Sequence, residues 1–170
     1  MKMAPQIIKS LLAVGAVLGA AESFALDKPN GRVILNVKGN ISVANTASGE
    51  AAFDKAMLND LGEVTLVTST PWTEGVNTFT GPKLSALLDA VGADGQTLVI
   101  TALNDYSAKM PVEDAYELGV LMAMNMNGKA MSVREKGPIF MLYPFDSDRS
   151  LDNEVIHNRS VWQVKSITVE

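Results

Sequence analysis

The chain has 170 residues, of which 19 are acidic and 14 are basic, so its formal net charge is −5. It contains no cysteine, which excludes a disulfide framework, an iron–sulfur cluster, a thiolate zinc site and a cysteine nucleophile. Its single histidine excludes a site with three histidine ligands, and the acidic balance argues against nucleic-acid binding, which needs clustered lysine and arginine.

The first 25 residues have the pattern of a cleaved export signal. Lys2 and Lys9 give a positive start, and the apolar run Leu11–Ala20 follows them. That run is too short to span a bilayer, which takes a helix of about 20 residues. Ser23-Phe24-Ala25 supplies small residues at positions −3 and −1 of a signal-peptidase site. The sequence therefore predicts a signal peptide over residues 1–25, with an uncleaved anchor as the alternative.

Residues 26–170 are predicted to form one domain, because they contain no linker and no internal repeat. A domain of this size can bury a core without disulfides. An exported chain that lacks cysteine fits a bacterial periplasm better than the extracellular space, where small proteins depend on disulfides. The predicted location is therefore the periplasm.

Hydrophobic periodicity predicts the elements of the first half of this domain. In chain order they are a strand, a helix, a strand, a helix and a strand, over Arg32–Lys38, Ala51–Asp60, Glu63–Thr68, Pro82–Gly92 and Thr97–Ala102. The second helix is the clearest, because four apolar residues from Leu84 to Val91 recur at positions i, i+3, i+4 and i+7. Thr97–Ala102 has little polar interruption, which favours a strand in the interior of its sheet.

The second half is predicted to contain a short acidic helix, four strands and a long acidic loop. The helix is Pro111–Leu118, the strands are Leu121–Met126, Ala130–Val133, Ile139–Tyr143 and Val161–Val169, and the loop is Phe145–Val155. Three methionines alternate within Leu121–Met126, which indicates a buried strand face rather than a metal-binding array. Strands and helices do not alternate regularly, so the predicted fold class is α+β with a mixed sheet and about three short helices.

Several segments, taken in order, carry a resemblance to a known family. They are Phe79-Thr80-Gly81-Pro82-Lys83-Leu84, Ala102-Leu103-Asn104-Asp105-Tyr106, Asn127-Gly128-Lys129-Ala130-Met131, Gly137-Pro138, Tyr143-Pro144 and Ser160-Val161-Trp162-Gln163. This succession resembles the molybdopterin-binding domain of the sulfite oxidase family and covers roughly residues 63–170. The resemblance implies a mixed α+β fold in which loops at one end of the sheets hold a pterin cofactor.

The chain departs from the enzymes of that family at the metal. In them a cysteine thiolate ligates molybdenum, and this chain has no cysteine. It is therefore more similar to the short, cysteine-free periplasmic relatives, the pterin-response pterin-binding proteins. That resemblance implies a non-catalytic sensor without a metal that binds a reduced pterin of the tetrahydropterin type. It also implies a partner, the periplasmic domain of an inner-membrane diguanylate cyclase/phosphodiesterase, and control of cyclic-di-GMP-dependent biofilm behaviour. The alternative is a molybdenum-cofactor-dependent oxidoreductase of the sulfite oxidase type.

A pterin presents a flat ring and a 2-amino-4-oxo edge, which call for an aromatic face and for carboxylate or carboxamide groups. Eight residues are the candidates: Trp72, Asn104, Asp105, Tyr106, Arg134, Tyr143, Arg149 and Trp162. Asp105 is a candidate acceptor for the ring's amino and N3 groups, with a turn residue as its alternative, and Trp72 is a stacking candidate, with core packing as its alternative. Core packing is favoured for Trp162. For His157 the sequence favours a surface or loop histidine, since no acidic or metal-ligating partner is evident nearby.

Overall fold

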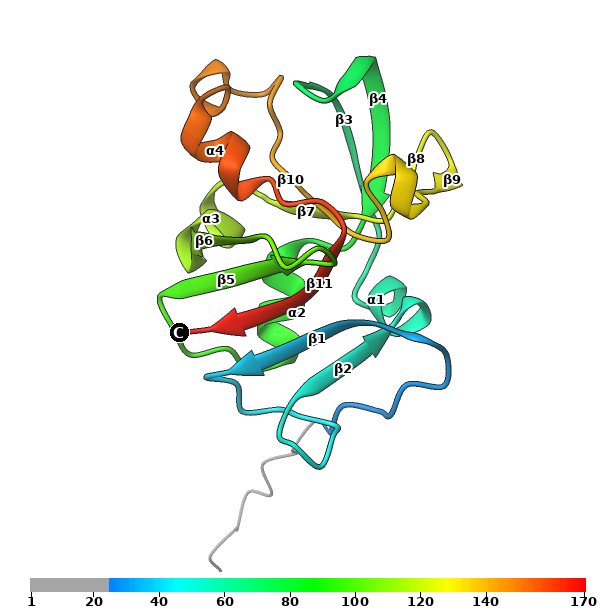
Figure 1. The fold of residues 1–170 in the computed structure, drawn as a ribbon, viewed down its shortest axis with the longest axis vertical. Helices are drawn as coiled ribbons and strands as arrows, with labels where there is room; N and C mark the ends of the chain where they lie inside the picture. The colour runs from blue at the N-terminus through cyan, green and yellow to red at the C-terminus, as the bar shows by residue number, and fades with distance from the viewer. Residues whose placement is uncertain (1–24) are drawn as a thin grey trace, which may run out of the picture.

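The computed structural model of the protein describes residues 25–170 (Figure 1). The predicted signal peptide, apart from Ala25, lies outside the described residues. A sheet of five strands forms one end of the molecule, and a β-hairpin and a short helix rise at the other end. Between the two ends lies a continuous hydrophobic core that both halves share.

The five-stranded sheet has the order β2-β1-β11-β5-β6. Its strands are β1 (Val33–Gly39), β2 (Ala51–Asp54), β5 (Thr97–Ala102), β6 (Ser107–Pro111) and β11 (Val164–Val169). β1 runs parallel to β11, and the other neighbouring pairs are antiparallel, so the sheet is mixed. β5 pairs on both sides, which confirms the interior position predicted for Thr97–Ala102.

The other strands form two smaller sheets. One has the order β3-β4-β8-β9, from β3 (Val64–Thr70), β4 (Thr73–Gly81), β8 (Asn125–Met126) and β9 (Lys129–Ala130). The other pairs β7 (Leu121–Ala123) with β10 (Phe140–Leu142). In Figure 1 the β3–β4 hairpin projects from the body of the molecule at the same end as helix α4.

Four α-helices and two 3₁₀ turns complete the described chain. They are α1 (Lys55–Asp60), α2 (Leu84–Ala90), α3 (Val112–Glu117), α4 (Glu154–Arg159), η1 (Val133–Glu135) and η2 (Arg149–Leu151). The predicted α+β class with a mixed sheet is confirmed, with four helices where about three were expected. Within residues 25–170, no helix is long and apolar enough to cross a membrane.

The helix predicted over Ala51–Asp60 is wrong in its first four residues, which form strand β2. Asp54 marks the change, because its carboxylate accepts the backbone N–H of Met57 at 3.0 Å and so caps α1. The same carboxylate accepts the N–H of Gly31 at 2.7 Å, which ties the start of the helix to the chain just before β1. These contacts lower the pKa of Asp54, the Met57 N–H most strongly.

The loop predicted over Phe145–Val155 is also wrong in part, because it contains η2 and the start of α4. Each begins at a polar cap: Asp148 accepts the N–H of Ser150 at 2.8 Å, and Asn153 accepts the N–H of Ile156 at 3.1 Å. α4 presents few apolar residues and so has no clear hydrophobic periodicity, but its cap is visible in the sequence.

Three predicted strands are shorter than expected. Leu121–Met126 splits at Met124, because β7 pairs with β10 whereas β8 pairs with β4. Only Lys129–Ala130 continues the hairpin, since a capping box between Ser132 and Glu135 turns the chain into η1. β11 begins at Val164, after Gln163 adopts a left-handed conformation with φ of 54°. The predicted methionine stripe is confirmed as core, with Met122 and Met124 buried.

Candidate functional site

A pocket of about 330 Å³ opens where the end of β5, the turn of the β3–β4 hairpin and the end of α4 meet. Its lining combines aromatic rings with amide and hydroxyl groups and contains no lysine or arginine. The lining residues are Trp72, Ala102, Asn104, Tyr106, His157, Asn158, Ser160, Val161 and Trp162. Four of them (Trp72, Asn104, Tyr106 and Trp162) are predicted site residues.

Trp72 is the centre of the aromatic wall. Its ring meets the ring of Trp162 edge to face, with centroids 5.5 Å apart, and meets that of His157 in the same way at 5.4 Å. Phe140 and Phe145 pack against it from the core side, each at 5.8 Å. Such edge-to-face contacts fix the orientation of a ring. The hairpin turn is held as well, since the N–H of Trp72 donates to the hydroxyl of Thr70 at 3.2 Å.

Trp162 lies on the pocket wall and not in a strand. Trp162 is 37% exposed, so the core packing favoured from the sequence is wrong. The ammonium of Lys136 lies 5.0 Å from the ring centroid, which is a cation–π contact. The two tryptophans, which are the only two in the chain, therefore both line the same pocket.

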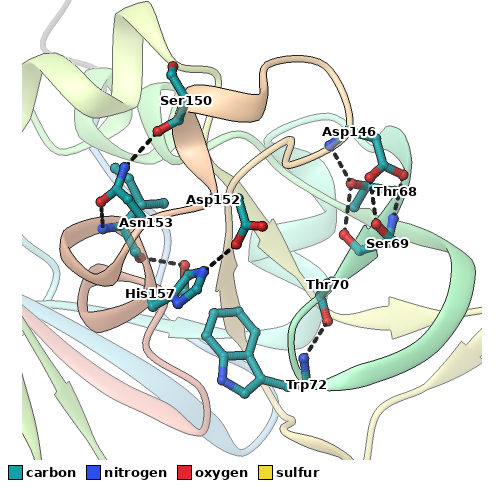
Figure 2. A network of polar contacts seen from close by, with 11 residues as sticks. Thr68, Ser69, Thr70, Trp72, Asp146, Ser150, Asp152, Asn153 and His157 are labelled. Carbon is teal, nitrogen blue, oxygen red and sulfur yellow. Dashed lines mark hydrogen bonds and ion pairs between the residues drawn. The ribbon is translucent and has the colours of Figure 1, made fainter.

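The single histidine, His157, forms part of the pocket wall on α4. Figure 2 shows its ring between the carboxylate of Asp152 and the ring of Trp72. The Nε2 of His157 lies 2.8 Å from a carboxylate oxygen of Asp152, five residues earlier. The expectation of a surface or loop histidine without an acidic partner is thus wrong. Asp152 orients the ring, and the backbone of His157 is held by α4, which Asn153 caps.

The segment Asn104-Asp105-Tyr106 divides its side chains between the pocket and the solvent. Asn104 and Tyr106 line the pocket, and the Oδ1 of Asn104 accepts the N–H of Tyr106 at 3.1 Å. Asp105 has φ of 67°, a left-handed conformation that turns it out of the lining. Its carboxylate, 83% exposed, pairs with the ammonium of Lys165. The structure therefore does not bring Asp105 into the pocket, as its predicted ligand role requires, and its observed partner is Lys165.

Three further predicted residues lie outside this pocket. Arg134 is exposed in η1, and Arg149 lines a neighbouring hollow together with Asp146 and Asp152. Tyr143 is fully buried, and its hydroxyl donates to Asp114 at 2.7 Å. Burial, followed by this hydrogen bond, raises the pKa of Tyr143 well above its usual range. The binding roles of all three stay predictions.

The buried carboxylate of Asp114 also organises the pocket. It accepts from Arg159 at 2.9 Å as well as from Tyr143, so it ties α3 to the end of α4 and to the end of β10. α4 carries His157 and Asn158 into the pocket. Asp114 and Arg159 are therefore positioning residues for this wall.

Five lining residues were missed in the sequence: Ala102, His157, Asn158, Ser160 and Val161. Most come from α4 and the residues that follow it, and three of these lie between the predicted loop Phe145–Val155 and the predicted strand Val161–Val169. The Asn153 cap was the available signal. It would have placed a helix one turn before His157 and so brought that segment into consideration.

The arrangement fits a flat heterocycle better than a protein-ligated metal. Aromatic rings provide faces, and the carboxamides of Asn104 and Asn158 provide both donors and acceptors. The chain has no thiolate, and residues 25–170 contain no group of three or more histidines, aspartates or glutamates placed to hold a metal ion.

Comparison with known proteins identifies the family of the domain. Residues 43–145 match the family model described as the oxidoreductase molybdopterin binding domain. Among solved structures, the chain is similar to the sulfane dehydrogenase SoxCD from Paracoccus pantotrophus, with a TM-score of 0.61 and 18% identity. The match covers 85% of this chain and 40% of that one, so the chain spans about two fifths of the neighbour's length. None of the curated proteins compared with the chain matches it.

These matches confirm the resemblance to the sulfite oxidase type of molybdopterin-binding domain, and they correct one prediction. The expectation that the protein is not an enzyme is contradicted, because the matching family is one of oxidoreductase domains. The solved neighbour is itself named as a dehydrogenase. The matches favour the alternative, an oxidoreductase-type molybdopterin-binding domain, over the sensor.

Proposed function

Because the chain belongs to the family of oxidoreductase molybdopterin-binding domains, we propose that it binds a pterin cofactor in the Trp72–Trp162 pocket for oxidoreductase chemistry. The observation that carries the proposal is the pocket itself, in which two tryptophans 5.5 Å apart flank polar amides. The pteridine ring would pack against the tryptophan faces, while its 2-amino-4-oxo edge meets the carboxamides.

Asn104 and Asn158 are suited to contact that edge. Within residues 25–170, neither the Nδ2 of Asn104 nor the carboxamide of Asn158 has a hydrogen-bond partner, although both residues line the pocket. The Oδ1 of Asn104 is already engaged by Tyr106, which holds the amide in one orientation. The Asn104 Nδ2 would therefore donate to a pterin carbonyl or ring nitrogen.

The same residues fit the pterin ring better than the rest of the family's cofactor. Molybdopterin supplies its own dithiolene sulfurs as metal ligands and brings redox chemistry through the metal, but it also carries a phosphate. This chain adds no thiolate, and no lysine or arginine lines the pocket to balance a phosphate. A reduced pterin of the tetrahydropterin type, which carries no phosphate, would therefore fit these residues as well, and it is the ligand of the second candidate function.

A second candidate function rests on the missing cysteine. Binding of a pterin without a protein thiolate would act as a signal that the pterin is present. That signal would control a partner protein. If the predicted export signal is cleaved as expected, that partner would be met in the periplasm, and the partner we propose is the periplasmic domain of a membrane diguanylate cyclase/phosphodiesterase.

One set of measurements tests both functions. Both tryptophans line the pocket, so a bound pterin should quench most of the intrinsic fluorescence, and titration with tetrahydrobiopterin should give a saturable decrease. Elemental analysis of protein purified from molybdate-fed cells then distinguishes the cofactors. Stoichiometric molybdenum with a phosphorylated pterin supports the oxidoreductase, whereas a phosphate-free pterin without molybdenum supports the second candidate.

The chain offers a matched pair of tyrosines as a control. Tyr106 lines the pocket and is 47% exposed, whereas Tyr116 lies on α3 and is 52% exposed. Tyr106→Ala should weaken the fluorescence titration, and Tyr116→Ala should leave it unchanged. Equal titration curves for wild type and Tyr106→Ala, or an absence of quenching in the wild type, would refute pterin binding in this pocket.

A further inference from the structure

The outer strand of the hairpin, β3, is an unusual edge. Within the described residues no strand pairs with its outer side. Its seven residues, Val-Thr-Leu-Val-Thr-Ser-Thr, include no charged residue and no proline. Native proteins usually protect such edges with charge, proline or very short strands, because an open edge pairs readily with another chain.

Three other sheet edges are protected by charge, proline, short length or burial. β6 carries Lys109 and Pro111, and β9 has only two residues, one of them Lys129. β2 is buried along its whole length. The open edge of β3 is therefore not a general property of the fold, and it calls for a separate explanation.

The backbone polarity of β3 follows from its partner strand. Val67 lies opposite Thr78, whose carbonyl accepts the N–H of Asn127 at 2.7 Å and whose N–H donates to the Asn127 side chain at 3.0 Å. Thr78 thus directs both backbone groups toward β8. In an antiparallel pair the residue opposite directs both of its groups the other way, so the N–H and C=O of Val67 face the open edge.

Thr65, two residues earlier, has the same orientation, and its partner Thr80 likewise accepts a hydrogen bond on the far side, from Met124 at 2.9 Å. Ser69, two residues later, marks the end of the open stretch. Its N–H donates to the carboxylate of Asp146 at 2.7 Å, as Figure 2 shows. The unpaired stretch of backbone is therefore Thr65–Val67, with a carboxylate at one end.

The side chains beside this edge are apolar and exposed. Val67 is 58% exposed, and Val76, its diagonal neighbour on β4, is 63% exposed. Both stand on the same face of the hairpin, because Val76 lies opposite Ser69, two residues from Val67. An added strand would cover Val67 and gain hydrogen bonds at the same time.

The charges around β3 indicate which kind of chain could pair with its open edge. Glu63 precedes the open stretch and Asp146 follows it, and the whole chain has a net charge of −5. A second copy paired antiparallel about Val67 would bring each Asp146 against its partner's edge, so that two carboxylates would be buried without cations. A segment with a lysine or arginine facing Asp146 would instead pair with it.

We propose that β3 is a docking edge for an extended segment of a partner protein. That segment has small β-branched residues at alternate positions and a basic residue that meets Asp146. It adds as a strand beside Thr65–Val67 and leaves the Trp72–Trp162 pocket open.

The probe for the test is the acetylated and amidated peptide Thr-Val-Thr-Val-Lys, added at up to millimolar concentration to the ¹⁵N-labelled protein. We expect the amide signals of Thr65 and Val67 to shift and their hydrogen exchange to slow, because both N–H groups gain acceptors. The same peptide with N-methyl groups on its two valines should produce neither effect. An absence of shifts at Thr65 and Val67 overturns the proposal, as does a response confined to the pocket.

Substitutions at Val67 separate backbone from side-chain effects. Val67→Pro removes only an outward-facing N–H, so the hairpin should fold, and peptide affinity should fall by roughly tenfold or more. Val67→Thr keeps that N–H and should bind within about twofold of wild type. If Val67→Pro fails to fold by circular dichroism, Val67→Lys serves in its place, since a cation on the edge blocks strand addition. A protein dimer in sedimentation that Val67→Pro abolishes would overturn the heterologous partner in favour of a second copy.

Discussion

The two ends of the molecule are stabilised by different kinds of contact. At the sheet end, aliphatic side chains such as Leu35 of β1, Leu88 of α2 and Ile100 of β5 are fully buried. At the pocket end, half-exposed rings meet edge to face around Trp72, and caps hold α4 and η2. Buried aliphatic area dominates folding stability, whereas exposed aromatic faces are available to a ligand. The comparison teaches that stability and recognition can be changed separately in this protein.

The largest expected effect is on the stability of the sheet end. Leu88 is fully buried in α2, so Leu88→Ala should lower the free energy of unfolding by about 2–5 kcal/mol. Urea denaturation measures this change. The folded fraction should bind pterin with wild-type affinity, because Leu88 does not line the pocket. Val155→Ala, at a 56% exposed position on α4, is the control and should change stability little.

The next effect concerns recognition. Trp72→Ala removes the central ring of the aromatic wall, and stacking of a base on an aromatic side chain is worth about 1–3 kcal/mol. Pterin affinity should therefore fall by roughly 5-fold to 150-fold, as calorimetry can measure. The far-ultraviolet circular dichroism spectrum should keep its shape, since the sheet end is untouched. If this variant bound pterin with wild-type affinity, the aromatic wall at the pocket end would not be the site of recognition.

Tyr143→Phe tests the boundary between the two regions. The variant removes a buried hydroxyl and leaves Asp114 with Arg159 as its remaining side-chain partner, which should cost about 1–3 kcal/mol of stability. Pterin affinity should change by less than about twofold, because Arg159 still holds α4. Thermal unfolding and calorimetry measure the two quantities. A loss of affinity as large as that of Trp72→Ala would make Tyr143 part of the site.

A smaller effect is expected from pH at the pocket end. The hydroxyl of Ser69, and then its N–H, lower the pKa of Asp146. The folded state therefore binds a proton at Asp146 less tightly than the unfolded chain does, in which the pKa of an aspartate is about 3.9. The resulting stability is present above that value and is lost as the pH falls through the lower folded pKa. Asp146→Asn should therefore lower the melting temperature at pH 7 and flatten its decline below about pH 4. Ser69→Ala should flatten the decline only in part, since the N–H remains.

The sequence predicted the buried elements at the centre of the sheet end better than the pocket end, for a physical reason, but it missed the edge strands β2 and β6. Buried elements such as Thr97–Ala102 and the helix containing Leu88 have a hydrophobic periodicity that is visible in the sequence. α4 and the strand Thr73–Gly81 present mostly polar or small residues, and their positions depend on caps and on pairing with β3. Such pairing is a long-range property that one segment does not encode by itself.

The residues of the candidate site were also predicted only in part. Trp72 and Tyr106 were found because aromatic residues in loops stand out, and the structure brings them to one pocket. Asp105 was chosen for the chemistry of its carboxylate, which is sound in principle. Its left-handed backbone conformation, which decides where that carboxylate points, has no sequence pattern beyond the turn-forming Asn-Asp pair.

The smallest effect is accordingly expected at Asp105. Asp105→Asn keeps a residue type that tolerates the left-handed conformation and removes only an exposed ion pair with Lys165, so stability should change by less than about 1 kcal/mol. Pterin affinity should stay at the wild-type value, because the carboxylate points out of the pocket lining. Asn104→Ala is the matched comparison, since it removes a neighbouring polar group that does line the pocket, and it should weaken binding in the same calorimetric titration. A reversed ranking, with Asp105→Asn losing tenfold or more and Asn104→Ala unaffected, would mean that the segment turns over when pterin binds and that Asp105 meets the pyrimidine edge of the ring.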